Sequence, residues 1–316
     1  MKGNKLKIYI LSCLFMLILL TIPKIVPAQQ DPMYTQYMFN TQTINPAYAG
    51  TWNCVGFQAL SRMQWVGIDG APSTQTFSFQ LPVNNFKMGL GLNLVNDQIG
   101  LERRFGLSAD YSYKLKVNGT TNLWMGLKGG FSIYSHNLSA HFLYPDGIED
   151  PAFTGDIDNQ FMPSTGVGFL LQNRKYYIGI SAPKLITTDY KGEGTNFAIY
   201  GEISHFFLIA GYVCPINSDI NFKPTILAKA TKGAPFEVDL SANFLLKDKF
   251  WFGATYRTGD SFGIVAQWLI DNNLRIGYAI DIAASKLRNF NYCSHEIMVS
   301  YELRLVKQDV ISPRYF

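Results

Sequence analysis

The four histidines are the first residues to test for catalytic or metal chemistry. No pair of them has the H-E-x-x-H spacing of a helical zinc site, and no hydrolase signature surrounds a serine. Ser204-His205 and Ser294-His295 are adjacent pairs in expected strands, where neighbouring side chains point to opposite faces. Neither serine can then use its neighbour as a base. The sequence therefore predicts neither an enzyme nor a histidine metal centre from His136, His141, His205 and His295.

An acidic segment supplies the other candidate ligands, Asp146, Glu149, Asp150, Asp156 and Asp158. Its spacing differs from an EF-hand and lacks the glycine of the EF-hand turn. A solvated acidic loop is the favoured interpretation, and a calcium site within 146–158 stays open as the alternative. Cys54, Cys214 and Cys293 are odd in number and widely spaced, without a C-x-x-C pair. This pattern favours neither a disulfide framework nor a zinc site, and we predict no cofactor.

The N-terminus has the three parts of an export signal. Lys2, Lys5 and Lys7 form a positive region, residues 8–22 are mainly apolar, and small residues precede position 29. We therefore predict a signal peptide over 1–28, cleaved between Ala28 and Gln29. A retained membrane anchor is the alternative, but the apolar stretch is shorter than the roughly 20 residues that span a bilayer.

The charge balance changes once this leader is set aside. Four of the 27 lysines and arginines precede residue 29, whereas none of the 23 acidic residues does, so the remaining 23 basic and 23 acidic groups cancel. A chain with no net positive charge has no basic field for nucleic acid. Aromatic residues make up 15% of the chain and charged residues only 16%. A chain so aromatic and so poor in charge, with no later apolar run of helical length, is typical of a membrane barrel.

Apolar and polar residues alternate in many segments, as they do in strands that separate two environments. Residues 236–246 and 295–305 show the alternation most clearly. We predict an all-β fold, an outer-membrane antiparallel β-barrel over 55–316, with about fourteen strands. Their ranges are 55–65, 73–81, 87–96, 104–115, 121–135, 164–172, 176–182, 205–214, 220–230, 236–246, 250–256, 261–270, 274–281 and 294–305.

The lengths of the connections separate a barrel from a soluble β-sandwich, in which strands also alternate. Every connection after an even-numbered strand is short, whereas 136–163, 183–204 and 282–293 all follow odd-numbered strands. Short periplasmic turns opposite long outer loops are typical of outer-membrane barrels. We therefore expect the cell outer membrane as the location and outer-membrane lipid around the wall.

The segment 29–54 precedes the first strand and has a different pattern. Asp31-Pro32 resembles a helix start, and Tyr34, Tyr37 and Met38 would share one helical face. Asn45-Pro46 would end the helix. We predict a short plug-like helix whose apolar face packs inside the barrel, with a disordered leader as the alternative.

The polar faces of the strands give a set of charges expected to face the lumen. They carry both signs, which favours ion pairs in a plugged barrel over an open, ion-selective porin. The set is Lys128, Glu237, Asp239, Arg275, Asp281, Glu296, Glu302 and Arg304.

Several motifs, in order along the chain, resemble one known family. They include Gln30 to Asn40, Ile44 to Gly50, Gln64 to Gly67, Asn96 to Gly100, Leu227 to Pro235, Tyr256 to Ser261 and Ser285 to Arg288. Together they are similar to the PorP/SprF family of outer-membrane proteins of the type IX secretion system, and they cover almost all of the chain after the leader. The loops 136–163 and 183–204 resemble the family least.

The resemblance implies a role in exporting large adhesins, including those of gliding motility, or in holding them at the surface. It implies as partners the C-terminal sorting domain of a secreted cargo protein and other type IX secretion components. Asn45-Pro46-Ala47 also resembles the hatch of FadL-like barrels, which take up small hydrophobic molecules, and this supplies a rival function. The plug or hatch residues are Asp31, Pro32, Tyr34, Gln36, Tyr37, Asn45, Pro46 and Ala47.

Overall fold

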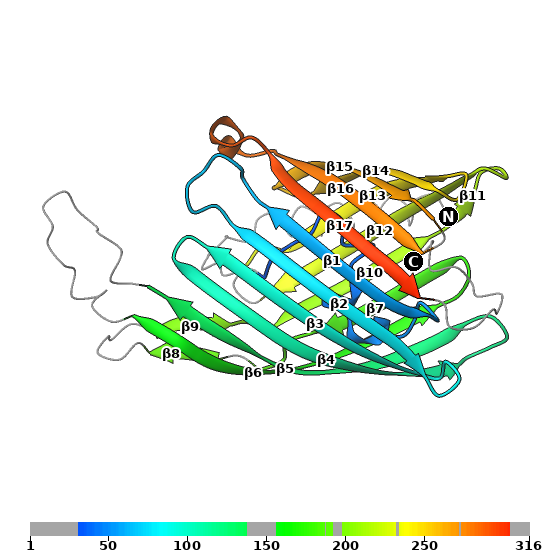
Figure 1. The fold of residues 1–316 in the computed structure, drawn as a ribbon, viewed down its shortest axis with the longest axis horizontal. Coiled ribbons are helices and arrows are strands. Elements are labelled where there is room, and N and C mark those ends of the chain that lie inside the picture. Colours follow the sequence, from blue (N-terminus) through cyan, green and yellow to red (C-terminus); the bar gives the residue numbers. More distant parts are fainter. Residues whose placement is uncertain are drawn as a thin grey trace, which may run out of the picture.

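Strands form where the sequence alternates, and they close into a ring (Figure 1). The structure is a computed structural model of the 316-residue chain. It describes residues 31–137, 156–186, 188–191, 198–231, 234–271 and 273–303. The predicted cleavage site Ala28–Gln29, the lumenal candidate Arg304 and most of the acidic loop lie outside these ranges.

Fourteen strand positions make up the wall, because β10 and β11 follow one another and both pair with β12 in the same register. The first eight positions are β1 (Val55–Met63), β2 (Ser73–Val83), β3 (Met88–Ile99), β4 (Glu102–Lys116), β5 (Asn122–His136), β6 (Ile157–Gln172), β7 (Tyr176–Ala182) and β10 (His205–Tyr212) with β11 (Cys214–Pro215). The remaining six are β12 (Ile220–Thr231), β13 (Glu237–Leu246), β14 (Phe250–Arg257), β15 (Ser261–Leu269), β16 (Leu274–Ala283) and β17 (Ser294–Leu303).

The ring closes between its first and last strands. β1 pairs antiparallel with β17 from Val55↔Leu303 to Met63↔His295, so the sheet has no terminal edge there. Closure lets every strand in the membrane find a neighbour for its backbone groups. The predicted fourteen-stranded antiparallel barrel is confirmed, and each of the fourteen predicted ranges overlaps one wall position.

The connections are sorted between the two ends of the barrel. Those between β2 and β3, β4 and β5, β6 and β7, and β13 and β14 are all tight turns. The long ones, after β5, β7 and β16, leave the opposite end. The last of them contains the 3-10 helix η4 (Lys286–Phe290), and the one after β7 contains a hairpin, β8 (Thr188–Lys191) with β9 (Ala198–Glu202), that the sequence did not predict.

The two faces of the wall differ in polarity. Outward side chains are largely apolar, and on β16 Ile276 and Tyr278 are 41% and 45% exposed, whereas the inward Arg275 and Asp281 are buried. The same alternation repeats around the ring and gives the barrel the apolar belt that a bilayer requires. Within the described ranges, no helix is both long and apolar enough to cross a membrane.

The N-terminal segment enters the ring, but it is not the predicted α-helix. It forms a turn over residues 35–39 followed by two 3-10 helices, η1 (Thr41–Thr43) and η2 (Pro46–Tyr48). Isolated helices this short are marginal in water. Side chains of the wall bind carbonyl groups of the segment, among them those of Tyr34, Thr43 and Ile44, which favours an irregular path.

Candidate functional site

The N-terminal segment and the inner wall form the candidate site. From Tyr34 to Trp52 every side chain except that of Thr43 is buried, and η2 lies against β4, β5 and β6. Figure 1 shows the segment inside the ring. The segment therefore occupies the lumen, and the wall binds it through four groups of contacts.

The first group joins the backbone of the segment to a carboxylate of β17. Glu296 accepts hydrogen bonds from the backbone N–H groups of Thr35 and Gln36, each at 2.9 Å. Arg62 of β1 lies 3.3 Å from the same carboxylate and 2.8 Å from Asp281 of β16, and all three side chains are buried. Asp281 also accepts a hydrogen bond from the Thr35 hydroxyl at 2.7 Å. A buried arginine balances two carboxylates here, and the segment supplies neutral donors.

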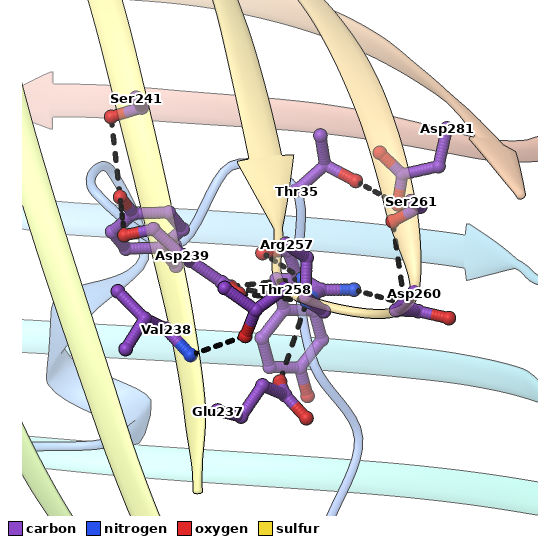
Figure 2. Close-up of polar contacts among 12 residues, drawn as sticks. Thr35, Glu237, Val238, Asp239, Ser241, Arg257, Thr258, Asp260, Ser261 and Asp281 are labelled. Atoms are coloured by element: carbon purple, nitrogen blue, oxygen red, sulfur yellow. Dashed lines mark hydrogen bonds and ion pairs between the residues drawn. The ribbon is translucent and has the colours of Figure 1, made fainter. Parts of the chain in front are cut away.

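The second group surrounds Arg257, at the end of β14 (Figure 2). Its guanidinium lies 3.0 Å from Asp239, 3.1 Å from Asp260 and 3.5 Å from Glu237. It also donates a hydrogen bond at 3.3 Å to the backbone carbonyl of Tyr34. Figure 2 shows Thr35 and Asp281 beside this cluster, so the first two groups of contacts hold adjacent residues of the segment.

The third group holds the start of the segment. The carboxylate of Asp31 lies 3.0 Å from Lys184 and 3.5 Å from both Arg104 and His205. Burial alone would raise the pKa of Asp31, but the charges of Lys184, His205 and Arg104 hold that pKa well below its ordinary value. Asp31 is therefore a charged anchor, and it does not cap a helix.

In the fourth group, the backbone of the wall lies close against the hatch-like residues Asn45, Pro46 and Ala47. The side-chain amide of Asn45 donates a hydrogen bond to the Phe169 carbonyl at 3.2 Å, and its oxygen accepts one from the backbone N–H of Ala47 at 3.0 Å. A Cβ on Gly126 of β5 would overlap the backbone nitrogen of Ala47, and one on Gly168 of β6 would overlap the Asn45 side-chain oxygen. The wall carries glycine where the hatch touches it.

An aromatic cluster lies between these groups. The Lys223 ammonium of β12 is fully buried, 4.9 Å from the ring centre of Phe39, 5.6 Å from that of Tyr177 and 5.8 Å from that of Trp251. It also lies 3.5 Å from the Met38 carbonyl oxygen. Ring faces attract a desolvated cation, so Lys223 ties the middle of the segment to the wall.

Seven of the eight predicted lumenal charges lie in the described part of the chain, all on the inner face. All seven, Lys128, Glu237, Asp239, Arg275, Asp281, Glu296 and Glu302, lie in the plug contacts or directly behind them. Arg275 lies 3.6 Å from Glu302 and 5.9 Å from the ring centre of Phe39, Lys128 lies 3.5 Å from Asp110, and Glu237 faces Arg257.

Sequence reasoning missed Arg62, Asp110, Lys223 and Arg257, although strict alternation places each of them on an inner face. On β1 the buried Leu60 lies on the same inner face as Arg62, and on β12 the buried Leu227 lies on the same inner face as Lys223. These leucines interrupt the polar pattern of the two strands.

A cavity of about 110 Å³ remains beside the start of the segment. Its lining combines charged groups with apolar ones, including Asp31, Asp97, Arg104, Ile44, Val95 and Phe207. Its volume suits a small molecule or a few water molecules and is far too small for a folded protein domain.

The described residues contain no cluster of three or more histidine, cysteine or acidic side chains that could hold a metal ion. Asp146, Glu149 and Asp150 lie outside the described ranges, whereas Asp156 and Asp158 are exposed. The calcium alternative thus stays untested. Cys54, Cys214 and Cys293 form no disulfide with one another.

Residues 26–301 match a known family, described as "Type IX secretion system membrane protein PorP/SprF". A comparison with curated proteins finds no match.

Solved barrels resemble the chain in overall shape. The monoaromatic hydrocarbon channel CymD is 12% identical with a TM-score of 0.49, and the match covers 86% of this chain and 94% of CymD. The Ralstonia pickettii toluene transporter TbuX is 12% identical with a TM-score of 0.47, covering 82% and 92%. The porin KdgM is 9% identical with a TM-score of 0.40, covering 79% and 100%.

Proposed function

The chain belongs to the PorP/SprF family of type IX secretion system membrane proteins, and from this premise we propose that its plugged barrel docks large surface proteins during or after export. It is an outer-membrane barrel component of that system and not an enzyme. The proposal concerns the cargo: adhesins, including those of gliding motility, that carry a C-terminal sorting domain. Other secretion components are its further partners.

The occupied lumen is the observation that carries this proposal. Lys184, Arg257 and Glu296 bind successive parts of the N-terminal segment, at Asp31, Tyr34 and Thr35. Among the described residues a cavity of about 110 Å³ remains beside the segment, so a protein would not pass through this barrel while the segment stays in place. The proposed role is therefore that of an anchor or adaptor beside a separate conduit. A buried polar network that holds one conformation also suits a docking protein.

The orientation of the barrel belongs to this proposal. We place the long connections after β5, β7 and β16 outside the cell, where cargo is retained. Protease sites inserted at 140–160, 188–198 or 284–290 should then be cut in intact cells. Sites at 117–119 or 216–218 should be cut only after the outer membrane is opened, and equal cutting of both sets would contradict the orientation.

Deletion of residues 31–44 tests the function. The barrel should still insert, because strand pairing satisfies the backbone of its wall. One or a few large proteins should disappear from the cell surface, as measured by surface proteomics. Wild-type surface composition in a strain whose deleted barrel is inserted and folded would contradict the proposal.

Uptake of a small hydrophobic molecule is the second candidate. The hatch-like Asn45-Pro46-Ala47 sits in the lumen, and the adjoining cavity has Ile44, Val95 and Phe207 in its lining. Cavities of this order can hold a molecule the size of benzene. The same deletion strain separates the candidates: impaired growth on fatty acids or hydrocarbons with an unchanged surface proteome would favour uptake.

A further inference from the structure

The wall is lower at β7 than at β6. β6 has 16 residues, whereas β7 has seven. Only Val167–Gln172 of β6 pairs with β7, although β6 pairs with β5 along nearly its whole length. Figure 1 shows β4, β5 and β6 projecting together at the end where the β8–β9 hairpin lies. One side of the projecting part of β6 therefore extends past its neighbour.

The register shows which backbone groups of β6 face this open side. Leu185 donates its backbone N–H to the Thr165 carbonyl at 2.7 Å, so Thr165 directs its backbone toward β7. Because backbone direction alternates along a strand, Phe161 and Pro163 direct theirs the same way. Neither has a strand partner on that side in the described part of the chain, and β8 and β9 pair only with each other. Proline, which lacks an N–H, is tolerated at such an edge.

Apolar grooves on the outer wall continue this edge. One of about 400 Å³ is lined by Phe169, Ile180, Ala182, Leu185, Phe206 and Ala228. A second of about 740 Å³ is lined by Ile178, Ala210, Tyr212, Pro224, Ile226 and Leu240. Above the first, Phe161 is 58% exposed and stacks on Phe131 of β5 with ring centres 5.2 Å apart. Edge and grooves thus form one surface from β6 to β13.

We propose that this surface is a docking site for an extended strand of a partner polypeptide, which pairs with the free edge of β6 at Phe161–Pro163 and lays apolar side chains into the groove below. The inference rests on the proposed function, because it names how a protein partner would engage the barrel. The partner is identified by its chemistry: a β-strand that brings backbone donors and acceptors at strand spacing, with apolar residues on one face.

Backbone chemistry favours a strand over lipid as the occupant. Acyl chains can fill the grooves, but they carry no donor for the Pro163 carbonyl and no acceptor for the Phe161 N–H. Backbone groups that have no access to water are costly to leave unpaired. An added strand satisfies these groups and also fills the apolar groove.

A photo-crosslinking residue at Thr165, used in intact cells that express the full chain, tests the proposal. We expect one adduct with a second polypeptide, mapped by mass spectrometry to an extended segment. Phe161→Pro should cut its yield about tenfold, because it removes an edge donor without removing a bond to β5. Phe161→Ala keeps that donor and should retain most of the yield. The same crosslinker at Phe105 of β4, which is outward-facing and paired on both sides, should give no such adduct.

Four results would overturn the docking site: adducts with lipid, adducts within the same chain, adducts with a second copy of it, or a yield unaffected by Phe161→Pro. Gel mobility with and without heating verifies that the variant barrel is folded. If the Phe161→Pro variant does not insert, the Phe161→Lys variant is used in its place. Its charge at the edge opposes strand addition.

The two proposals can fail separately. If deletion of 31–44 stops surface display and Phe161→Pro leaves both the adduct and display unchanged, docking at β6 is wrong and the function stands. If Phe161→Pro removes the adduct while neither variant alters the surface proteome, the docking site stands and the export function fails.

Discussion

The two halves of the inner wall hold the N-terminal segment by different physical means. Strands β1 and β13–β17 bind residues 34–36 with buried charges, above all Glu296, Arg62 and Arg257. Strands β5 and β6 bind its second part with glycines that leave room for Asn45–Ala47. We call β1 and β13–β17 the charged half of the wall, and β5 and β6 the glycine half. The polar groups that the charged half binds can form hydrogen bonds with water or another protein instead. The glycine half accepts the segment only in the conformation that fits against its backbone. We infer that the first part of the segment is the releasable one.

Loss of Glu296 should have the largest effect. Glu296→Ala leaves two backbone N–H groups and one side of Arg62 without their buried acceptor. Removing one partner of a buried ion pair costs about 3–5 kcal/mol of unfolding free energy. Denaturant titration of the barrel in lipid vesicles measures this loss.

Glu237→Ala is the matched control. Arg257 keeps Asp239 and Asp260 when Glu237 is removed, so we expect a loss of about 1 kcal/mol or less. Equal losses in the two variants would show that Glu296 does not clamp the segment.

The outer face of β16 lies against lipid, whereas its inner face carries Arg275 and Asp281. Ile276→Arg on the lipid side of β16 should cost roughly 2–4 kcal/mol if it lies near the middle of the bilayer, measured by the same titration. Ile276→Val should be nearly silent. A silent Ile276→Arg would mean that the faces are reversed.

Gly126→Ala tests the glycine half of the wall. The new methyl group would overlap the backbone of Ala47, and overpacking of this kind costs about 1–3 kcal/mol. Gly129→Ala, on the same strand with open space around its Cβ, should change stability by less than about 0.5 kcal/mol. If the two substitutions behave alike, the hatch does not rest on β5.

Asp31 gives the smallest expected effect and a pH dependence. Its pKa is lowered in the folded protein, so its stabilisation is complete above the ordinary value near 3.8 and is lost as pH falls through the folded value. We expect Asp31→Asn to cost about 1.5 kcal/mol at pH 7, and less as the pH falls below 3.8. Titrations at pH 7 and pH 3 check this, and a difference that does not change with pH would remove Asp31 as a charged anchor.

The barrel could be predicted because its signals are local. Alternation within each segment and the lengths of successive connections fix the strands, and all fourteen positions follow from them. The shape of the N-terminal segment could not be predicted in this way. Thr35 and Gln36 bind Glu296, about 260 residues away in the sequence, and a helical pattern in the segment gives no sign of that acceptor.

The charged contacts were predictable only in part. The pattern pointed to Glu296 and Asp281, yet it missed Arg62, their common partner, because Leu60 interrupts the polar face of β1. The low wall at β7 also has no clear signal in the sequence, since strand length depends on what the neighbouring strands pair with.

The central claim is that residues 31–54 close the lumen, and ion conductance tests it most directly. Wild-type protein in a planar lipid bilayer should conduct scarcely at all, because the plug fills the ring. The barrel lacking residues 31–44 should show stable open channels, and Glu296→Ala should show brief openings as its plug detaches. Stable wild-type conductance equal to that of the deletion variant would contradict the account.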